Sequence, residues 1–152
     1  AKVKDQIDDA LARGATAVVG GGVEGRFVSP TILTGVTPDM KVYCEETFGP
    51  VVPVIPFRTD EEAIAIANDT EYGLSSGVIT RDENRGLAIA ERLETGMCHI
   101  NCSPVNDEPH APFGGVKSSG VGRYGGRWAM ENFTETRWIT MDRGGRPYPP
   151  VF

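Results

Sequence analysis

The chain has 152 residues, of which 39% are hydrophobic and 24% charged, a composition typical of one globular domain with a sizeable core. Its net charge is −6, from 15 basic and 21 acidic residues, and this balance argues against nucleic acid as a partner. No apolar run reaches membrane-spanning length and no signal peptide opens the chain, so we expect no membrane contact. Three cysteines favour reduced thiols in the cytoplasm over a disulfide framework.

The first third of the chain predicts a helix, short strands and a glycine turn. An apolar repeat over residues 3–11 has helical spacing, and Gly14 follows where a helix C-cap belongs. The apolar run 15–19 predicts a strand. Residues 20–25 match the G-x-G-x-x-G pattern of dinucleotide-binding folds, but the β-rich segment 26–33 that follows offers no helix N-terminus to a pyrophosphate. We therefore interpret residues 20–25 as a turn between strands.

The stretch from Tyr43 to Pro50 opens like a strand and ends at a Gly-Pro breaker. In an extended chain, side chains two residues apart share one side, so Glu46 and Phe48 are expected to face the same way. A carboxylate can accept hydrogen bonds from two neighbouring sugar hydroxyls, and an aromatic ring can lie against a heteroaromatic face. The pair therefore suits a nucleotide sugar that carries a planar ring. The competing interpretation is an acidic turn with Phe48 in the core.

After Pro50 the pattern alternates between strands and helices, which favours right-handed crossovers and a parallel sheet. Asp60 is expected to cap the first of these helices. A capping box that begins at Thr80 is expected to lead the second, with Leu87 facing inward. The expected strands are 51–57, 74–80, 97–101 and a final 136–141, and a short helix is expected at 126–133.

A long polar connection at residues 103–119 follows the strand 97–101, and such loops are usually functional. A second G-x-G-x-x-G match at 120–125 precedes the short helix, but no strand is expected before it, so we expect no phosphate there. Cys98 and Cys102 would lie roughly 13 Å apart along a strand, too far to hold one metal ion. We therefore expect no metal site, and Cys102, beside the loop, is the one candidate for a reactive thiol.

Several separated motifs resemble those of the aldehyde dehydrogenase superfamily. Residues 45–51, Glu-Glu-Thr-Phe-Gly-Pro-Val, are similar to its Glu-x-Phe-Gly-Pro motif. Asn101-Cys102 and then residues 112–120, Pro-Phe-Gly-Gly-Val-Lys-Ser-Ser-Gly, resemble its closing motifs in the right order. Family members are several-fold longer, so the resemblance is to the C-terminal portion only. The start of the chain inside a helical pattern is also what we expect of a fragment.

The resemblance implies an α/β fold. Residues 1–133 would form the C-terminal, parallel-sheet part of the catalytic domain, and residues 134–152 an oligomerisation strand with an irregular tail. It further implies NAD or NADP as cofactor, with NAD favoured. By resemblance, Glu46 would hold the ribose on the nicotinamide side, Phe48 would pack beside the nicotinamide ring, and Leu74 would touch the same end of the cofactor.

The resemblance also implies a substrate pocket. Residues 105–109, Val-Asn-Asp-Glu-Pro, are similar to a Val-His-Asp-Glu stretch of benzaldehyde, vanillin and salicylaldehyde dehydrogenases, with Asn106 in place of the histidine. An aromatic aldehyde is therefore the expected substrate, with Val105, Asn106, Asp107 and Phe113 on the pocket wall. Phe113 is also placed to anchor the glycine turn that follows it, and both roles stay open.

In the family, a cysteine thiolate attacks the aldehyde, hydride passes to nicotinamide and a base-activated water hydrolyses the thioester. No cysteine here has the surroundings of that nucleophile, and we find no general-base glutamate segment, so both are expected upstream of Ala1. We expect the isolated chain to be inactive without the missing N-terminal part. We expect the complete enzyme to be a homo-oligomer. The competing hypothesis is a binding or assembly module whose strand 136–141, carrying Trp138, joins another subunit's sheet.

Overall fold

The computed structural model describes residues 2–145, which form two compact units, one up to Thr70 and one from Glu71 onward. The domain boundary expected at residue 133 stays a prediction. Part of the expected tail, residues 146–152, lies outside the described residues. Among the described residues, no helix combines the length and apolar character that crossing a membrane requires.

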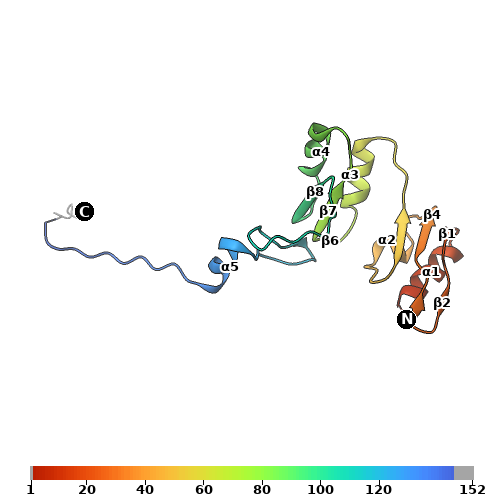
Figure 1. Ribbon diagram of the computed structural model, residues 1–152, viewed down its shortest axis with the longest axis horizontal. Helices are drawn as coiled ribbons and strands as arrows, with labels where there is room; N and C mark the ends of the chain where they lie inside the picture. Colours follow the sequence, from red (N-terminus) through yellow and green to blue (C-terminus); the bar gives the residue numbers. More distant parts are fainter. Residues whose placement is uncertain (1, 146–152) are drawn as a thin grey trace, which may run out of the picture. The chain divides into compact units, whose positions relative to one another are not determined.

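The first unit has three helices and five strands among its described residues (Figure 1). In chain order they are α1 (Lys2–Ala12), β1 (Thr16–Val19), β2 (Val23–Glu24), β3 (Phe27–Val28), β4 (Thr31–Thr34), α2 (Lys41–Cys44), β5 (Val51–Val54) and α3 (Asp60–Asn68). The second unit contains β6 (Tyr72–Gly73), β7 (Ser75–Val78), α4 (Glu83–Ala90), β8 (Met97–Ile100), β9 (Val116–Lys117) and α5 (Gly126–Phe133).

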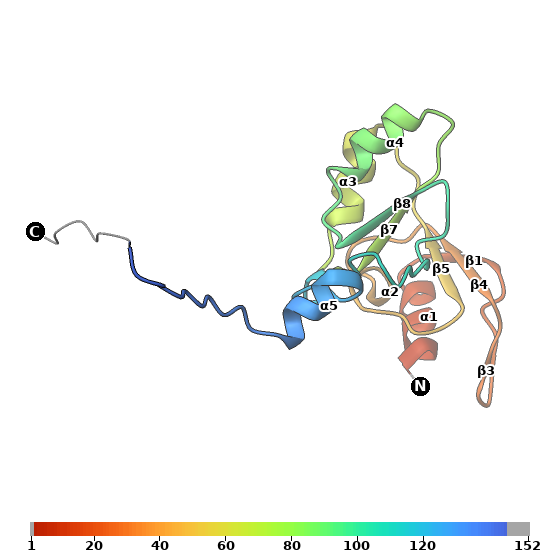
Figure 2. The same ribbon diagram turned by 60° about the vertical axis from the view of Figure 1, so that its left-hand side comes forward.

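The sheet of the first unit has the order β1-β4-β5, with β1 antiparallel and β5 parallel to β4 (Figure 2). Strands β7 and β8 of the second unit also pair in parallel, as the alternation after Pro50 predicts. Because β5 and the β7–β8 pair belong to separate sheets, the parallel sheet expected over residues 51–101 is not confirmed. The glycine turn at 20–25 leads into the antiparallel hairpin of β2 and β3, as expected, and no helix follows it.

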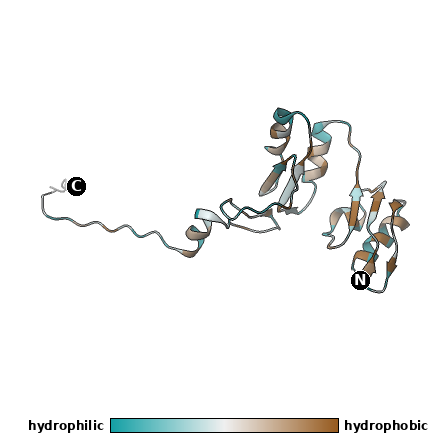
Figure 3. Ribbon diagram, viewed as in Figure 1, coloured by the Kyte–Doolittle hydropathy of each residue, from teal (hydrophilic) through white to brown (hydrophobic). Residues whose placement is uncertain are grey.

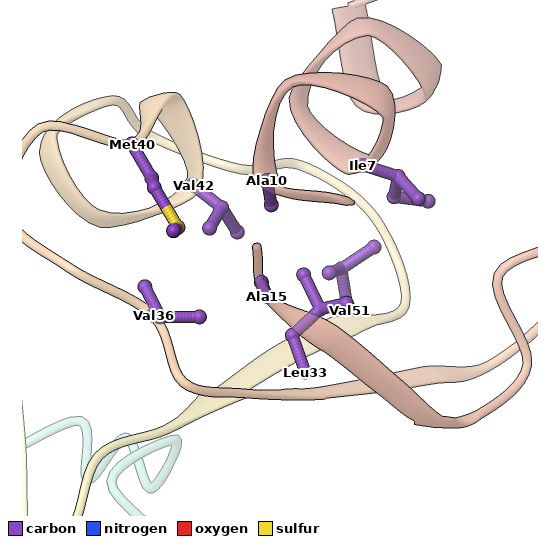
Figure 4. Close-up of a cluster of buried hydrophobic side chains, with 8 residues drawn as sticks. All are labelled: Ile7, Ala10, Ala15, Leu33, Val36, Met40, Val42 and Val51. Carbon is purple, nitrogen blue, oxygen red and sulfur yellow. The ribbon is translucent and has the colours of Figure 1, made fainter. Parts of the chain in front are cut away.

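The core of the first unit lies between α1, α2 and the sheet. Side chains from all three meet there, and the strands are among the most hydrophobic parts of this unit (Figures 3 and 4). Along β4 the side chains alternate, so that Leu33 is completely buried while Ile32 is exposed. The cluster consists of Ile7, Ala10, Ala15, Leu33, Val36, Met40, Val42 and Val51.

The second unit joins its segments through close backbone approaches at glycines. A Cβ added to Gly96, just before β8, would lie 1.8 Å from the carbonyl oxygen of Gly114. One added to Gly114 would lie 2.5 Å from the carbonyl oxygen of Gly122. Real Cβ atoms never approach so closely, so the Gly-Gly of the Pro-Phe-Gly-Gly segment is required by packing between backbones.

Four local expectations are wrong. The strand-like start of the 43–50 stretch is instead the end of helix α2. The N-cap of α3 is Thr59, whose hydroxyl accepts from the Glu62 amide at 3.2 Å, and Asp60 is the first helical residue. The N-cap of α4 is Asp82 and not Thr80, and Gly86 is buried in this helix while Leu87 is half-exposed.

The expected last strand, 136–141, is not formed among the described residues. Between α5 and Gly145 the chain makes no strand pairing, and the large apolar side chains of this stretch are exposed. Trp138 is 90% exposed, and both Ile139 and Met141 are 75% exposed.

The Gly96–Gly114 approach gives a stability test. Gly96→Ala should lower the free energy of unfolding by about 2 kcal/mol or more, because the new methyl would overlap a backbone carbonyl that has no rotamer to adopt. Both tryptophans, Trp128 and Trp138, lie in the second unit, so urea unfolding followed by tryptophan fluorescence reports on it.

Gly77→Ala is the matched control, because its Cβ would make only an ordinary contact of 3.5 Å with Pro104 in an extended strand. We expect that change to stay within about 1 kcal/mol of the parent. Equal stability of the two variants would contradict the packing account.

Candidate functional site

Glu46 and Phe48 lie on an irregular segment directly after α2, and both side chains are exposed. Phe48 is 84% exposed, although a phenylalanine normally contributes to stability by burial. The residue between them, Thr47, is half-buried and its Oγ1 is inaccessible to solvent. Glu45, Gly49 and Pro50 are exposed as well, so exposure alone does not assign Glu46 and Phe48 to one side, and their shared side stays a prediction. The competing interpretation, with Phe48 in the core, does not describe this unit.

Helix α1 holds this segment at both ends. At one end, the Nε2 of Gln6 donates to the carbonyl oxygen of Glu46 at 3.2 Å. At the other end, Val3 packs so closely against Gly49 that an added Cβ would lie 2.8 Å from its Cγ2. The backbone that presents Glu46 and Phe48 is therefore fixed from the same helix on both sides.

Helix α1 also fixes the start of α2. The carboxylate of Asp9 accepts from the backbone amide of Lys41 at 2.9 Å and from the Nε of Arg13 at 2.9 Å. These two donors, first the amide and then the guanidinium, hold the pKa of Asp9 below its ordinary value. The ammonium of Lys41 meets Asp5 at 2.7 Å. A helix of four residues thus gains its first N–H partner from a neighbouring helix instead of its own N-cap, since Met40 makes no side-chain cap.

Tyr43 ties α2 to the end of α3. Its hydroxyl donates to Asp69 at 2.7 Å. Burial and then this hydrogen bond to a carboxylate raise the pKa of Tyr43 to about 12. The residue three positions before Glu46 is therefore also held in place.

The other candidate residues lie in the second unit. Leu74 connects β6 and β7 and is 41% exposed. The next residue, Ser75, donates through Oγ to the carbonyl oxygen of Pro104 at 2.6 Å. This bond joins the chain around Leu74 to the start of the long loop, where Val105 is 88% exposed. The structure thus brings the Leu74 segment and the first part of the predicted pocket wall together.

The rest of the loop is open at its middle and anchored at its end. Asn106 and Asp107 are exposed and lie outside regular structure. Phe113 is 37% exposed, and its backbone exchanges two hydrogen bonds with Tyr124, at 2.8 and 2.7 Å. These bonds belong to the backbone of Phe113, so both roles expected of its side chain stay predictions, and part of that side chain is accessible to solvent.

The second glycine match, 120–125, does not form a phosphate site. A short strand, β9, precedes it, which the sequence did not predict, but β9 pairs antiparallel with β6 and belongs to no βαβ unit. The backbone amides of Tyr124 and Gly126 donate to the carbonyl oxygens of Phe113 and Pro109. The first amide of α5 is thus already occupied by protein.

The cysteines do not assemble with other side chains. Within residues 2–145, no three His, Cys, Asp or Glu side chains lie close enough to hold a metal ion. Cys44 donates to the carbonyl oxygen of Met40 at 3.4 Å, Cys98 is half-buried on β8, and Cys102 is exposed.

The supporting residues were missed by sequence reasoning, although one signal was present. Gln6 lies between Val3, Ile7 and Ala10 on the apolar side of α1, and a polar residue in such a stripe indicates a specific partner. No local pattern predicts the hydrogen bonds of Asp9 or Tyr43, because their partners lie 32 and 26 residues away in the sequence.

Comparison with known proteins shows one family. The family model described as "Aldehyde dehydrogenase family" matches residues 1–139. The chain is 49% identical to a vanillin dehydrogenase of Pseudomonas fluorescens over 148 residues, which covers 97% of this chain and 31% of that protein. It is 46% identical to a benzaldehyde dehydrogenase of Bacillus subtilis over 143 residues, which covers 94% of this chain and 30% of that protein.

Solved structures agree. A salicylaldehyde dehydrogenase from Pseudomonas putida G7, complexed with salicylaldehyde, matches with a TM-score of 0.90 at 45% identity, over 97% of this chain and 31% of that one. A Mycobacterium tuberculosis aldehyde dehydrogenase complexed with NAD+ matches with a TM-score of 0.86 at 39% identity, over 95% of this chain and 31% of that one. The chain therefore spans about a third of the length of these relatives.

The pKa of Tyr43 gives a test of the local geometry. Because the folded pKa is about 12 and the unfolded one about 10, the contribution of Tyr43 to stability is present below pH 10 and is lost as the pH rises toward 12. In a tyrosinate absorbance titration of the folded chain, Tyr43 should ionise late, and Tyr43→Phe should remove its contribution to the late absorbance change.

Tyr124→Phe, which removes a tyrosine from the second unit, serves as the control and should leave the late contribution of Tyr43 in place. Circular dichroism at each pH identifies the range in which the chain is folded. A late absorbance change that is undiminished in Tyr43→Phe would contradict the Tyr43–Asp69 contact.

Proposed function

Because the chain belongs to the aldehyde dehydrogenase family, we propose that it is the C-terminal portion of an enzyme that oxidises an aromatic aldehyde to a carboxylic acid with NAD(P)+. In this portion the chain's own residues orient the cofactor and line the substrate pocket. The observation that carries the proposal is the exposed Glu46–Phe48 pair on a backbone that α1 holds at both ends.

The chemistry of this pair fits the nicotinamide end of the cofactor, which accepts hydride when bound. The carboxylate of Glu46 accepts from the two ribose hydroxyls, and the ring of Phe48 packs beside the nicotinamide. Leu74, in the second unit, is a further candidate for an apolar contact with the cofactor. NAD is favoured over NADP because the Mycobacterium tuberculosis structure holds NAD+ and a benzaldehyde dehydrogenase among the relatives is named for NAD(+).

The substrate proposal rests on the relatives and on the loop. Vanillin, benzaldehyde and salicylaldehyde dehydrogenases are 44–49% identical to this chain. In the loop, Val105 and Phe113 offer apolar surface to an aromatic ring, while Asn106 and Asp107 offer polar groups to its substituents. Asn106 departs from the Val-His-Asp-Glu stretch that this segment resembles, so it is the position at which we propose that substrate preference differs.

The nucleophilic cysteine and the general base are proposed to lie outside this chain, in the part of the enzyme that precedes it. The enzyme works in the cytoplasm as a homo-oligomer. The exposed segment 136–141 supports the oligomer, because its unpaired backbone and its Trp138 suit addition to the sheet of another subunit. The same exposed segment favours the second candidate function, a non-catalytic assembly module.

An activity assay separates these possibilities. The 152-residue chain, mixed with NAD+ and benzaldehyde, should form no NADH, because it supplies neither the nucleophile nor the base. The complete enzyme that contains this sequence should form NADH under the same conditions. Turnover by the isolated chain would contradict the absence of the nucleophile, and no turnover by any longer natural form would favour the assembly module.

The role of Glu46 is tested in the complete enzyme by Glu46→Gln. Loss of a charged acceptor for the ribose hydroxyls should weaken NAD+ binding about tenfold, as measured by titration calorimetry. Glu45→Gln is the matched control, since the neighbouring carboxylate makes only an exposed ion pair with Lys2 at 3.6 Å. Equal effects of the two changes would contradict a specific role for Glu46.

A further inference from the structure

Gln6 is completely buried, with 0% of its surface exposed. Glutamine is mostly found on protein surfaces, because taking its amide out of water costs free energy unless both ends of the amide find partners. Its neighbours on the same side of α1, Ile7 and Ala10, belong to the apolar core. A polar residue at this position therefore requires an explanation beyond packing.

Only one end of the Gln6 amide is used within the described chain. Nε2 donates to the carbonyl oxygen of Glu46 at 3.2 Å, across 40 residues of sequence. Oε1 is buried and has no hydrogen-bond partner, and the same is true of the Oγ1 of Thr47. An unpaired buried acceptor is unfavourable, so an apolar side chain of similar size would stabilise the fold at least as well as glutamine does.

The one contact that an apolar side chain could not make is the donation to Glu46. That contact acts on the backbone of a residue whose own side chain is exposed. At the other end of the segment, Val3 blocks movement of Gly49 by direct packing. Gln6 thus supplies the directional contact and Val3 the steric one, one turn apart on the same helix.

We propose that Gln6 is a positioning residue for the cofactor contacts. Its amide fixes the backbone at Glu46, which sets where the Glu46 carboxylate and the Phe48 ring meet the nicotinamide end of NAD(P). The proposal rests on the proposed function for the cofactor, but its structural part, that Gln6 fixes the 46–48 backbone, stands independently of it.

Gln6→Met tests the structural part in the 152-residue chain. Methionine keeps the length and volume of the side chain and removes the donor. Hydrogen exchange followed by mass spectrometry should show amides 46–49 exchanging at least several-fold faster, while the amides of β4 keep the rate of the parent. Ile7→Val is the matched control, because it removes one methyl from the adjacent core residue on the same helix without touching Glu46.

The outcome that overturns the structural part is unchanged exchange at 46–49 in Gln6→Met, or an equal increase in Ile7→Val. If Gln6→Met fails to fold, Gln6→Asn replaces it. That variant keeps the amide but shortens the side chain by one methylene, so the donor no longer reaches the Glu46 carbonyl, and the same increase in exchange is expected.

The functional part is tested in the complete enzyme with NAD+ itself. Gln6→Met should weaken NAD+ binding about fivefold, in line with the loss of one positioning hydrogen bond, and should raise KM for NAD+ with a smaller change in kcat. The double variant Gln6→Met/Glu46→Gln should lose less NAD+ affinity than the two single effects combined, because part of the Gln6 effect is exerted through the Glu46 carboxylate.

The single variants distinguish failure of the proposed cofactor function from failure of the positioning role of Gln6. If Glu46→Gln leaves NAD+ affinity unchanged, the proposed cofactor function is wrong, whatever Gln6 does to hydrogen exchange. If Glu46→Gln weakens binding while Gln6→Met does not, the cofactor function stands and the positioning inference is wrong. Strictly additive effects in the double variant would also contradict it.

Discussion

The attachment of the 41–49 segment to helix α1 is the constraint on which the first unit depends. Five contacts contribute to this attachment. Asp9 accepts from the Lys41 amide, Asp5 pairs with the Lys41 ammonium, and Lys2 pairs with Glu45. The Gln6 amide donates to the Glu46 carbonyl, and Val3 packs on Gly49. The apolar core lies beneath, with Ile7 and Ala10 on one side and Met40 and Val42 on the other. Because a four-residue helix cannot sustain itself in water, α2 owes its conformation to these tertiary contacts.

The same constraint explains why the strand predicted at the start of residues 43–50 is instead the end of α2. Val42, Tyr43 and Cys44 have the composition of a strand, and local propensity favours that assignment. The helical turn forms because its first amide bonds to Asp9, 32 residues earlier, and no local pattern contains that partner. In contrast, α1, β1, β8 and α5 were predicted correctly, because their hydrophobic periodicity and their glycine stops act within the element itself.

The roles of the glycines also depend on contacts that are distant in sequence. The sequence suggested phosphate loops at two glycine-rich segments, 20–25 and 120–125, and gave chemical reasons to reject both. In these segments a Cβ on Gly20 would lie 2.1 Å from the carbonyl oxygen of Pro30, and one on Gly125 would lie 2.3 Å from that of Ala111. Glycines elsewhere in the chain also permit close approaches. Gly114 and Gly96 allow backbones to pass within a distance that no Cβ permits, and Gly86 lets α4 lie against Ile100 of β8. This last approach also explains the error in the expected inward position of Leu87. A helix that packs through a glycine turns its smallest residue, not its largest apolar one, toward the sheet.

At the candidate site, too, the sequence pattern identifies the residues of the short motif but not the distant residues that hold them. The residues proposed to touch the cofactor, Glu46 and Phe48, are two positions apart, so they can be recognised in the sequence as a short motif. Gln6 lies 40 positions before Glu46, and Val3 lies 46 positions before Gly49, the end of the same segment. Both are on a helix whose periodicity predicts only a core contact. An exposed phenylalanine contributes little to folding, and a fully buried glutamine with a free acceptor is unfavourable for it. Each departs from what stability alone would select. The carbonyl that accepts from Gln6 belongs to Glu46, two residues before Phe48. This proximity supports the proposal that the buried glutamine and the exposed phenylalanine serve one function.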